Sequence, residues 1–206
     1  MKKMVLGLMV VAGLLGTNTV VANAADTDNT NTSTGDVAFS SGTLSLSVVD
    51  NTNLSFGKST ISAADATLNA STTPTVKVSD LRGTNAGWSL TVAQGQQFNT
   101  KTDASGSALT KAALTVASTK VSSDSTVNTG NATLTPGTTT SGTTTNGAAG
   151  TVASALAGDG NGISTFTFGG STLAVPGATP KLAQGYTTTL TWNLGDTPSN
   201  GATPSN

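Results

Sequence analysis

Apolar and polar residues alternate in a short stretch that contains the first of the chain's two tryptophans. In an extended strand, successive side chains point to opposite faces. Trp88, Leu90 and Val92 therefore share one face, and Ser89 and Thr91 share the other. This alternation predicts a β-strand whose apolar face packs against a core.

The second tryptophan lies in a stretch with the same alternation, near the end of the chain. One face of this stretch carries Tyr186, Thr188, Leu190, Trp192 and Leu194, and the residues between them are three threonines and one asparagine. Aromatic residues make up only 4% of the chain. The placement of both tryptophans in matching strands therefore indicates that these two strands carry much of the core.

Similar short alternating runs recur along the rest of the chain, separated by clusters of Gly, Asn, Asp and Pro. They comprise Val37 and Phe39; Leu44, Leu46 and Val48; Leu54 and Phe56; Val76 and Val78; Leu114 and Val116; Phe166 and Phe168; and Leu173 and Val175. The pattern predicts an all-β protein, an antiparallel β-sandwich or barrel-like single domain with long loops and little helix. Residues 151–157 are the best candidate for one or two helical turns.

Polar segments divide the chain into its predicted parts. Residues 25–35 are rich in Asn and Thr and are predicted to form a flexible spacer, and residues 199–206 a disordered tail. The domain itself is expected over residues 36–198. Within it, residues 136–150 are almost wholly Thr, Gly, Ser, Asn and Ala. Because this run has nothing to bury, we predict a mobile loop inserted between strands.

The start of the chain has the pattern of an export signal. A basic start and an apolar run over residues 4–15 precede the small-residue sequence Ala22-Asn23-Ala24. This pattern predicts a secretory signal peptide over residues 1–24, cleaved between Ala24 and Ala25. No other segment has the roughly 20 apolar residues that a membrane span requires. The mature chain is therefore expected outside the cell, with no membrane span.

Composition argues against several classes of function. Without the two signal-peptide lysines, seven basic residues stand against ten acidic ones, a net charge of −3, whereas a nucleic-acid-binding protein carries a basic patch. The chain has no His, no Cys and no Glu, so nucleophilic triads and His- or Cys-based metal sites are not available. A pair of Asp residues could still serve glycoside hydrolysis, but the Asp residues lie mostly in turn sequences. We expect no catalysis, no cofactor and no metal.

One turn sequence, Asp159-Gly160-Asn161-Gly162, is similar to part of a calcium-binding loop. Such a loop needs an acidic ligand at its start and a bidentate Glu at its end. In this chain those positions are occupied by Ala157 and Phe168. We therefore predict a tight glycine-rich turn between strands rather than a metal site.

The two tryptophan stretches share a tripeptide pattern, Trp88-Ser89-Leu90 and Trp192-Asn193-Leu194. The first follows the sequence Val78-Ser79-Asp80-Leu81-Arg82-Gly83, with Gly87 directly before Trp88, and the second follows Gly185-Tyr186. With these tripeptides and the sequences before them, the chain resembles the WxL proteins, secreted surface proteins of low-GC Gram-positive bacteria. The resemblance covers roughly residues 36–198.

The resemblance implies a non-catalytic module at the cell surface that associates non-covalently with the peptidoglycan of the cell wall. It also implies partners, namely other WxL proteins and a membrane-anchored WxL-interacting surface protein, and therefore a surface complex. A second hypothesis is an adhesin-like or matrix subunit that binds a protein partner and is held at the wall only indirectly. A low-charge, Thr-rich β surface suits either role.

The motif residues Trp88, Leu90, Trp192 and Leu194 allow a structural and a binding interpretation. Tryptophans can stack on sugars, which suits a role in peptidoglycan binding. Each tryptophan, however, shares its strand face with Leu or Val, so we favour core packing for both, with the indole N–H groups satisfied inside the fold. Tyr186 remains open, because a Tyr at the start of a strand can reach solvent or cap a loop.

Asp80 and Arg82, the only arginine of the chain, form the other candidate pair. A guanidinium group offers a planar fork that matches a carboxylate. We favour an ion pair with Asp80 or a contact with a loop carbonyl, fixing the turn from Gly83 to Gly87 that leads into the first tryptophan strand. The alternative is a contact between Arg82 and a wall carboxylate or a partner protein.

Overall fold

The computed structural model describes residues 33–50, 53–103 and 105–198. The predicted signal peptide, its cleavage site, most of the predicted spacer and the predicted tail lie outside these residues. The chain divides into two units, Met1–Ala38 and Phe39–Asn206. In the first unit, the described residues 33–38 form no strand. All the described strands belong to the second unit.

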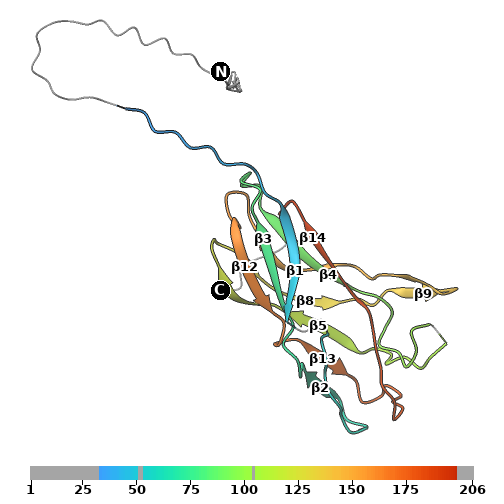
Figure 1. The fold of residues 1–206 in the computed structure, drawn as a ribbon. Coiled ribbons are helices and arrows are strands. Elements are labelled where there is room, and N and C mark those ends of the chain that lie inside the picture. The colour runs from blue at the N-terminus through green and yellow to red at the C-terminus, as the bar shows by residue number, and fades with distance from the viewer. Residues whose placement is uncertain (1–32, 51–52, 104, 199–206) are drawn as a thin grey trace, which may run out of the picture. The chain divides into compact units, whose positions relative to one another are not determined.

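Fourteen strands form in the described residues, which contain no helix (Figure 1). Their bounds are β1 Leu44–Asp50, β2 Ala66–Asn69, β3 Thr75–Asp80, β4 Trp88–Gln94, β5 Ala113–Ala117, β6 Thr119–Ser123, β7 Asn128–Thr129, β8 Asn131–Leu134, β9 Thr138–Thr140, β10 Thr143–Thr145, β11 Gly150–Ala155, β12 Gly162–Thr167, β13 Thr172–Val175 and β14 Leu190–Gly195. The predicted all-β class is therefore confirmed.

The strands pair in three antiparallel four-stranded sheets and one hairpin. The motif sheet, which contains both tryptophan strands, has the order β14-β4-β11-β7. The facing sheet has the order β1-β3-β12-β6, the third sheet has the order β2-β13-β5-β8, and β9 pairs with β10. None of these sheets closes on itself in the described chain, so the fold is sandwich-like rather than a barrel.

The two tryptophan strands are direct neighbours, although about a hundred residues separate them in the sequence. In the antiparallel pair of β4 and β14, Leu90 lies opposite Leu194, and Trp192 lies opposite Val92. Val92 follows Leu90 by two residues along β4, and Trp88 precedes Leu90 by two residues. Along the pair of strands, the two leucines therefore lie between the two tryptophans, near the end where β4 begins and β14 ends.

One hydrophobic core joins the three sheets. The facing sheet covers the motif sheet through aromatic contacts: Trp88 meets Phe166, and Trp192 meets Phe168. The third sheet adds Leu114 and other apolar side chains to the same cluster. Because the chain has no cysteine, this apolar cluster and the strand ladders hold the fold together.

Residues 151–157 do not form the helical turns that the sequence predicted. Most of them belong to β11, which pairs with β4 on one side and β7 on the other. Val152, Ala153 and Ala155 are completely buried there. The helical prediction was wrong because an interior strand supplies both of its neighbours with backbone hydrogen bonds, and this outweighs the weak helical preference of Ala.

The segment 136–150, predicted as a loop, contains the hairpin of β9 and β10 and the first residue of β11. The turn residues Ser141 and Gly142 both have positive φ, 51° and 80°, as a type I′ hairpin turn requires. Across the hairpin, the hydroxyls of Thr139 and Thr144 are 2.8 Å apart and share a hydrogen bond. Sequence periodicity did not reveal these strands, because neither face carries apolar residues.

Candidate functional site

The first motif tryptophan, Trp88, is completely buried, with an exposed fraction of 0%. Its indole Nε1 donates a hydrogen bond to the carbonyl oxygen of Gly160 at 3.0 Å. Its ring makes an edge-to-face contact with Phe166, with the ring centroids 5.9 Å apart. A buried indole with a satisfied N–H has no free face on which a sugar could stack. In this structure, Trp88 is closed to ligands.

The glycine-rich turn before β12 is the part of the chain that receives this indole. Gly160 has a φ of 81°, and a Cβ added there would lie only 2.5 Å from Nε1 of Trp88. The next residue, Asn161, donates from Nδ2 to Oδ1 of Asn85 at 2.6 Å, and the amide of Gly158 donates to the Asn85 carbonyl. Residues 158–161 therefore hold both the indole of Trp88 and Asn85, which lies in the turn that leads into β4.

The second motif tryptophan, Trp192, is only partly buried. Its ring packs against Phe168 with a centroid distance of 4.6 Å. No hydrogen-bond partner of its indole N–H is found among the described residues, in contrast to Trp88. The leucines of the two motifs differ in the same way, since Leu90 is buried and Leu194 is half-buried. The reason is that β4 lies inside its sheet, whereas β14 is an edge strand.

Asp80 and Arg82 form a bidentate ion pair at the end of β3. Arg82 Nε donates to Asp80 Oδ1 at 2.9 Å, and one terminal nitrogen, Nη2, donates to Oδ2 at 2.8 Å. The backbone N–H of Arg82 also donates to Oδ1 at 3.2 Å. Asp80 has an exposed fraction of only 2%, so this carboxylate depends on the guanidinium for its charge partner.

The same guanidinium reaches both tryptophan motifs. Nη2 of Arg82 also donates to the carbonyl of Gly87, directly before Trp88, at 2.6 Å. Nη1 donates to the carbonyl of Asp196, just after β14, at 3.1 Å. We call these four residues, Asp80, Arg82, Gly87 and Asp196, the Arg82 network. It joins the end of a strand in the facing sheet to the motif sheet.

The Arg82 network also determines how much of the guanidinium is left for an outside ligand. A guanidinium has five N–H donors, and four hydrogen bonds from Arg82 side-chain atoms stay within the network. The hydrogen bond from Arg82 lowers the pKa of Asp80, although burial opposes this shift. The same hydrogen bond raises the pKa of Arg82. Both groups are therefore charged at neutral pH and directed toward each other rather than toward a wall carboxylate.

The two candidate glycines of the turn before β4 both have positive φ, 69° at Gly83 and 74° at Gly87. At Gly83 an added Cβ would meet nothing within 4 Å, so only the backbone conformation favours glycine there. At Gly87 an added Cβ would lie 2.5 Å from the carbonyl oxygen of Ala155. The close approach of β11 therefore requires glycine at the position before the first tryptophan.

Tyr186 packs half-buried against the core, and its hydroxyl accepts a hydrogen bond from the backbone N–H of Leu182 at 2.8 Å. It thus caps the loop before β14. In the same loop, the ammonium group of Lys181 lies within hydrogen-bonding distance, 3.1 to 3.2 Å, of four backbone carbonyls, those of Ser62, Pro176, Gly177 and Thr179, which share its three N–H donors. Nothing in the sequence points to this role of Lys181, because the carbonyls around it come from segments distant in sequence as well as nearby.

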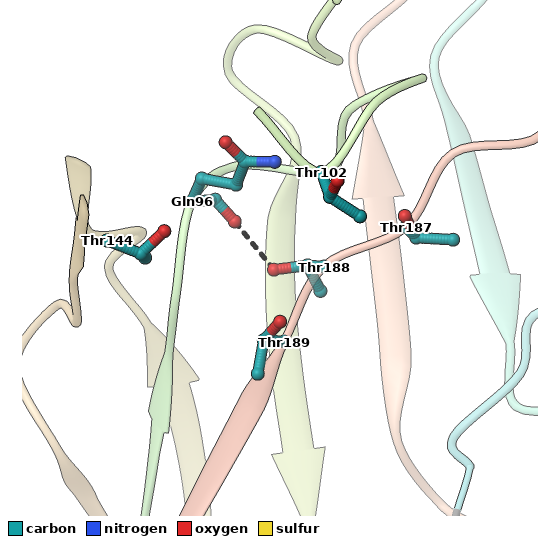
Figure 2. Close-up of a pocket in the computed structure, with 6 residues that line it drawn as sticks. All are labelled: Gln96, Thr102, Thr144, Thr187, Thr188 and Thr189. Carbon is teal, nitrogen blue, oxygen red and sulfur yellow. Dashed lines mark hydrogen bonds between the residues drawn. The ribbon is translucent and has the colours of Figure 1, made fainter. Parts of the chain in front are cut away.

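A polar cleft of about 240 Å³ lies where the two tryptophan strands meet at the end of β4 and the start of β14 (Figure 2). Its lining residues come from the segment after β4, from β10 and from the segment before β14, and are Gln96, Thr102, Thr144, Thr187, Thr188 and Thr189. None of these side chains is ionisable. The cleft could not be predicted from the sequence, since nothing in the sequence pairs residues 96–102 with residues 187–189.

Thr188 is held in place at the bottom of a short hydrogen-bond chain. Its hydroxyl donates to the carbonyl of Gln96 at 2.6 Å, as Figure 2 shows, and accepts from Nε2 of Gln94 at 3.5 Å. Gln94 is completely buried, and its Oε1 has no hydrogen-bond partner among the described residues. Because the Thr188 hydroxyl donates elsewhere, the amide must present its N–H side to Thr188.

Neither a metal site nor a membrane helix is found in the described ranges. No group of three or more His, Cys, Asp or Glu residues there could hold a metal ion. Nor does this part of the chain contain a helix that could span a bilayer.

These features define an all-β module built on two paired tryptophan strands. The chain belongs to the WxL family, described as WxL domain surface cell wall-binding, whose model matches residues 17–198. Comparisons with the curated proteins and with the solved structures found no match. Family membership makes the chain a surface protein associated with the cell wall, as the resemblance of both motifs predicted.

Proposed function

We propose that this protein is a non-catalytic surface protein that associates non-covalently with the peptidoglycan of the cell wall, as a small WxL subunit of a surface complex. The observation that carries the proposal is the match to a cell wall-binding family over residues 17–198. The match includes both tryptophan strands, which lie side by side in one sheet. Binding without catalysis is what such a module would contribute to a complex.

The roles of the Asp residues support a binding function. Asp80 is paired with Arg82. Asp65 accepts a hydrogen bond from the amide of Gly177, and Asp124 accepts one from the amide of Ile163. These carboxylates stabilise turns or ion pairs, as Asp residues in turn sequences commonly do. Each of the three carboxylates thus has a structural partner within the described chain.

The exposed edge of β14 supports the expectation of protein partners. Among the described strands, β14 pairs with β4 alone. Its other edge therefore offers backbone N–H and C=O groups to which an extended segment of a partner could add as a strand. Other WxL proteins and a membrane-anchored WxL-interacting surface protein are the partners that we propose. This edge is also the feature that favours the second candidate function, an adhesin-like or matrix subunit held at the wall through a partner.

Sedimentation with isolated peptidoglycan sacculi tests the proposal. The mature chain, residues 25–206, is incubated with sacculi alone, with partner ectodomains alone and with both. Sedimentation with sacculi alone is the expected result. Retention only in the presence of a partner would replace direct wall binding by the second candidate function. Because the mature chain has a net charge of −3, a repeat at high salt separates specific binding from screened charge attraction.

A further inference from the structure

We infer that the polar cleft between the end of β4 and the start of β14 is the binding site for a neutral N-acetylated sugar unit of the wall glycan. This inference rests on the proposed wall binding and identifies the part of the wall that is recognised. The cleft is lined by Gln96, Thr102, Thr144, Thr187, Thr188 and Thr189 (Figure 2). It lies beside both tryptophan strands without using either tryptophan as a contact.

The charge of the cleft selects for a neutral ligand. All six lining side chains are uncharged amides or hydroxyls. The charged neighbours of Thr102 are engaged with Ser105: Lys101 Nζ donates to its hydroxyl at 3.3 Å, and Asp103 Oδ1 accepts from it at 2.6 Å. A charged ligand group would lose water here and find no charged side chain in the lining to pair with. The cleft therefore suits glycan hydroxyl and acetamido groups better than the charged groups of a stem peptide.

Several polar groups of the cleft are available to a ligand. The hydroxyls of Thr102, Thr187 and Thr189 make no hydrogen bond to any described residue, and each can both donate and accept. Gln96 uses its Nε2 to donate to the carbonyl of Lys101 at 2.8 Å, which leaves its Oε1 as an acceptor. An acetamido group offers one N–H and one C=O, and sugar hydroxyls offer both functions. The threonine methyl groups add apolar contacts for the acetyl methyl.

The backbone around the cleft is fixed before any ligand arrives. Thr187 exchanges two backbone hydrogen bonds with Asn99, each of 2.9 Å, and Gly95 donates to the carbonyl of Thr189 at 2.8 Å. Thr188, between them, is held by Gln94 and by the Gln96 carbonyl. A site held in its binding geometry loses less entropy when a ligand binds.

The hairpin of β9 and β10 forms one side of the cleft. Thr144 of β10 is the residue of the hairpin that lines the cleft (Figure 2). The base of the hairpin is held to the end of β4, because Gly147 donates to the Gln94 carbonyl at 2.8 Å and Gly137 donates to the Gly95 carbonyl at 2.6 Å. The low-complexity segment 136–150 thus acquires a role, which is to complete the site.

The volume of about 240 Å³ is below the roughly 300 Å³ at which pockets for drug-sized ligands begin. It therefore fits one sugar unit rather than an oligosaccharide. A single unit held by a few hydrogen bonds binds weakly. Retention at the wall then depends on the many copies of the unit along the glycan and on several protein copies within a complex.

A titration with soluble glycans tests the site. The probe is chitohexaose, a β-1,4-linked oligomer of N-acetylglucosamine, added to the mature chain and followed by amide chemical shifts. The comparison ligand is cellohexaose, which has the same linkage without acetamido groups. We expect shifts at the lining residues with chitohexaose and a dissociation constant at least about tenfold weaker for cellohexaose, because two hydrogen-bonding groups are lost.

Two variants and one matched control locate the binding. T187V/T189V removes two hydroxyls that support no described hydrogen bond, and it should weaken chitohexaose binding by about tenfold or more. Thr102→Trp fills the cleft and should abolish the shifts. Thr165→Val, on β12 of the facing sheet, makes the same change outside the cleft and should bind like the natural chain.

The outcomes separate the site from the proposed function. If both cleft variants bind chitohexaose like the natural chain, the site assignment is wrong. Equal binding of the two glycans would overturn recognition of the acetamido group. If the natural chain sediments with sacculi but does not bind chitohexaose, the cleft does not recognise the glycan, although wall binding stands. Failure of the natural chain to sediment with sacculi would instead contradict the proposed function itself.

Discussion

Replacing Arg82 by Met tests whether the Arg82 network is structural. Met keeps the length of an unbranched side chain and removes every guanidinium donor. The variant loses two hydrogen bonds to the Asp80 carboxylate, one to the Gly87 carbonyl and one to the Asp196 carbonyl. What remains for Asp80 is the backbone N–H of residue 82, at 3.2 Å in the natural chain. The substitution therefore leaves a carboxylate without a counter-charge.

The burial of the pair sets the size of the effect. Removing one member of a buried ion pair costs about 3–5 kcal/mol. The side chain of Asp80 is 1% exposed and that of Arg82 is 16% exposed, so water reaches the arginine end of the pair. We therefore expect the lower end of the range, about 3 kcal/mol. In a chain of this size, that loss corresponds to a fall in Tm of about 6–12 °C.

The assay is thermal unfolding of the mature chain, followed by circular dichroism and calorimetry, for Arg82→Met and two companion variants. Arg82→Lys keeps a charge near Asp80 but has no planar fork to reach Gly87 and Asp196 as well, so we expect a loss of about 1–2 kcal/mol. The double variant D80N/R82M also removes the orphaned charge. It should recover part of the stability that Arg82→Met loses.

Two results would refute this reasoning. If Arg82→Met melts within about 2 °C of the natural chain yet no longer sediments with sacculi, the guanidinium contacts a ligand and the network is not structural. If D80N/R82M is no more stable than Arg82→Met, the loss does not come from an unpaired carboxylate. A normal affinity per folded molecule in every variant is the outcome that we expect.

Three further predictions concern other parts of the fold. Because the pKa of Asp80 is lowered in the folded chain, the ion pair with Arg82 stabilises the natural chain fully above the unfolded pKa of about 3.9. This stabilisation is lost as the pH falls through the lower folded pKa. When Tm is measured at decreasing pH, it should therefore fall more steeply for the natural chain than for D80N/R82M. Gly160→Ala forces a Cβ against Trp88 at positive φ and should cost about 2–4 kcal/mol. The control Gly158→Ala, where φ is also positive but an added Cβ would meet nothing within 4 Å, should cost only about 1 kcal/mol. A denaturant titration of both variants measures this difference. Trp192→Ala should lower stability by about 2–3 kcal/mol, less than the loss expected when a fully buried tryptophan is replaced. It should leave sacculus binding per folded molecule unchanged. A variant that melts normally but does not bind would place Trp192 in the binding site.

The difference in burial between Trp88 and Trp192 could not be predicted from the sequence. Both strands have the same alternation, so the sequence predicted the same buried role for both tryptophans. In the structure, Trp88 is buried and bonded to Gly160, whereas Trp192 is partly exposed. The difference depends on which strand has neighbours on both sides, and the pairing of strands distant in sequence is not written in the local pattern.

The strands in the polar segment 136–150 could not be predicted from the sequence either. The hairpin within residues 136–150 is held by backbone hydrogen bonds, and its threonines show no apolar periodicity. Periodicity reports burial, so a strand without a buried face cannot be recognised by it. For the same reason the cleft, which depends on the meeting of residues 96–102, 144 and 187–189, was invisible in the sequence.

By itself, the sequence determined the all-β class, the two tryptophan strands and the family, because alternation and short motifs are local properties of a chain. Only the tertiary structure decided that the two motifs are neighbours, that Arg82 joins them, that residues 151–155 are an interior strand and that a polar cleft lies at the meeting point. Each of these depends on contacts between residues far apart in sequence. Such contacts are set by how sheets pair and pack, where each backbone group must find a partner, and not by the preferences of any one segment.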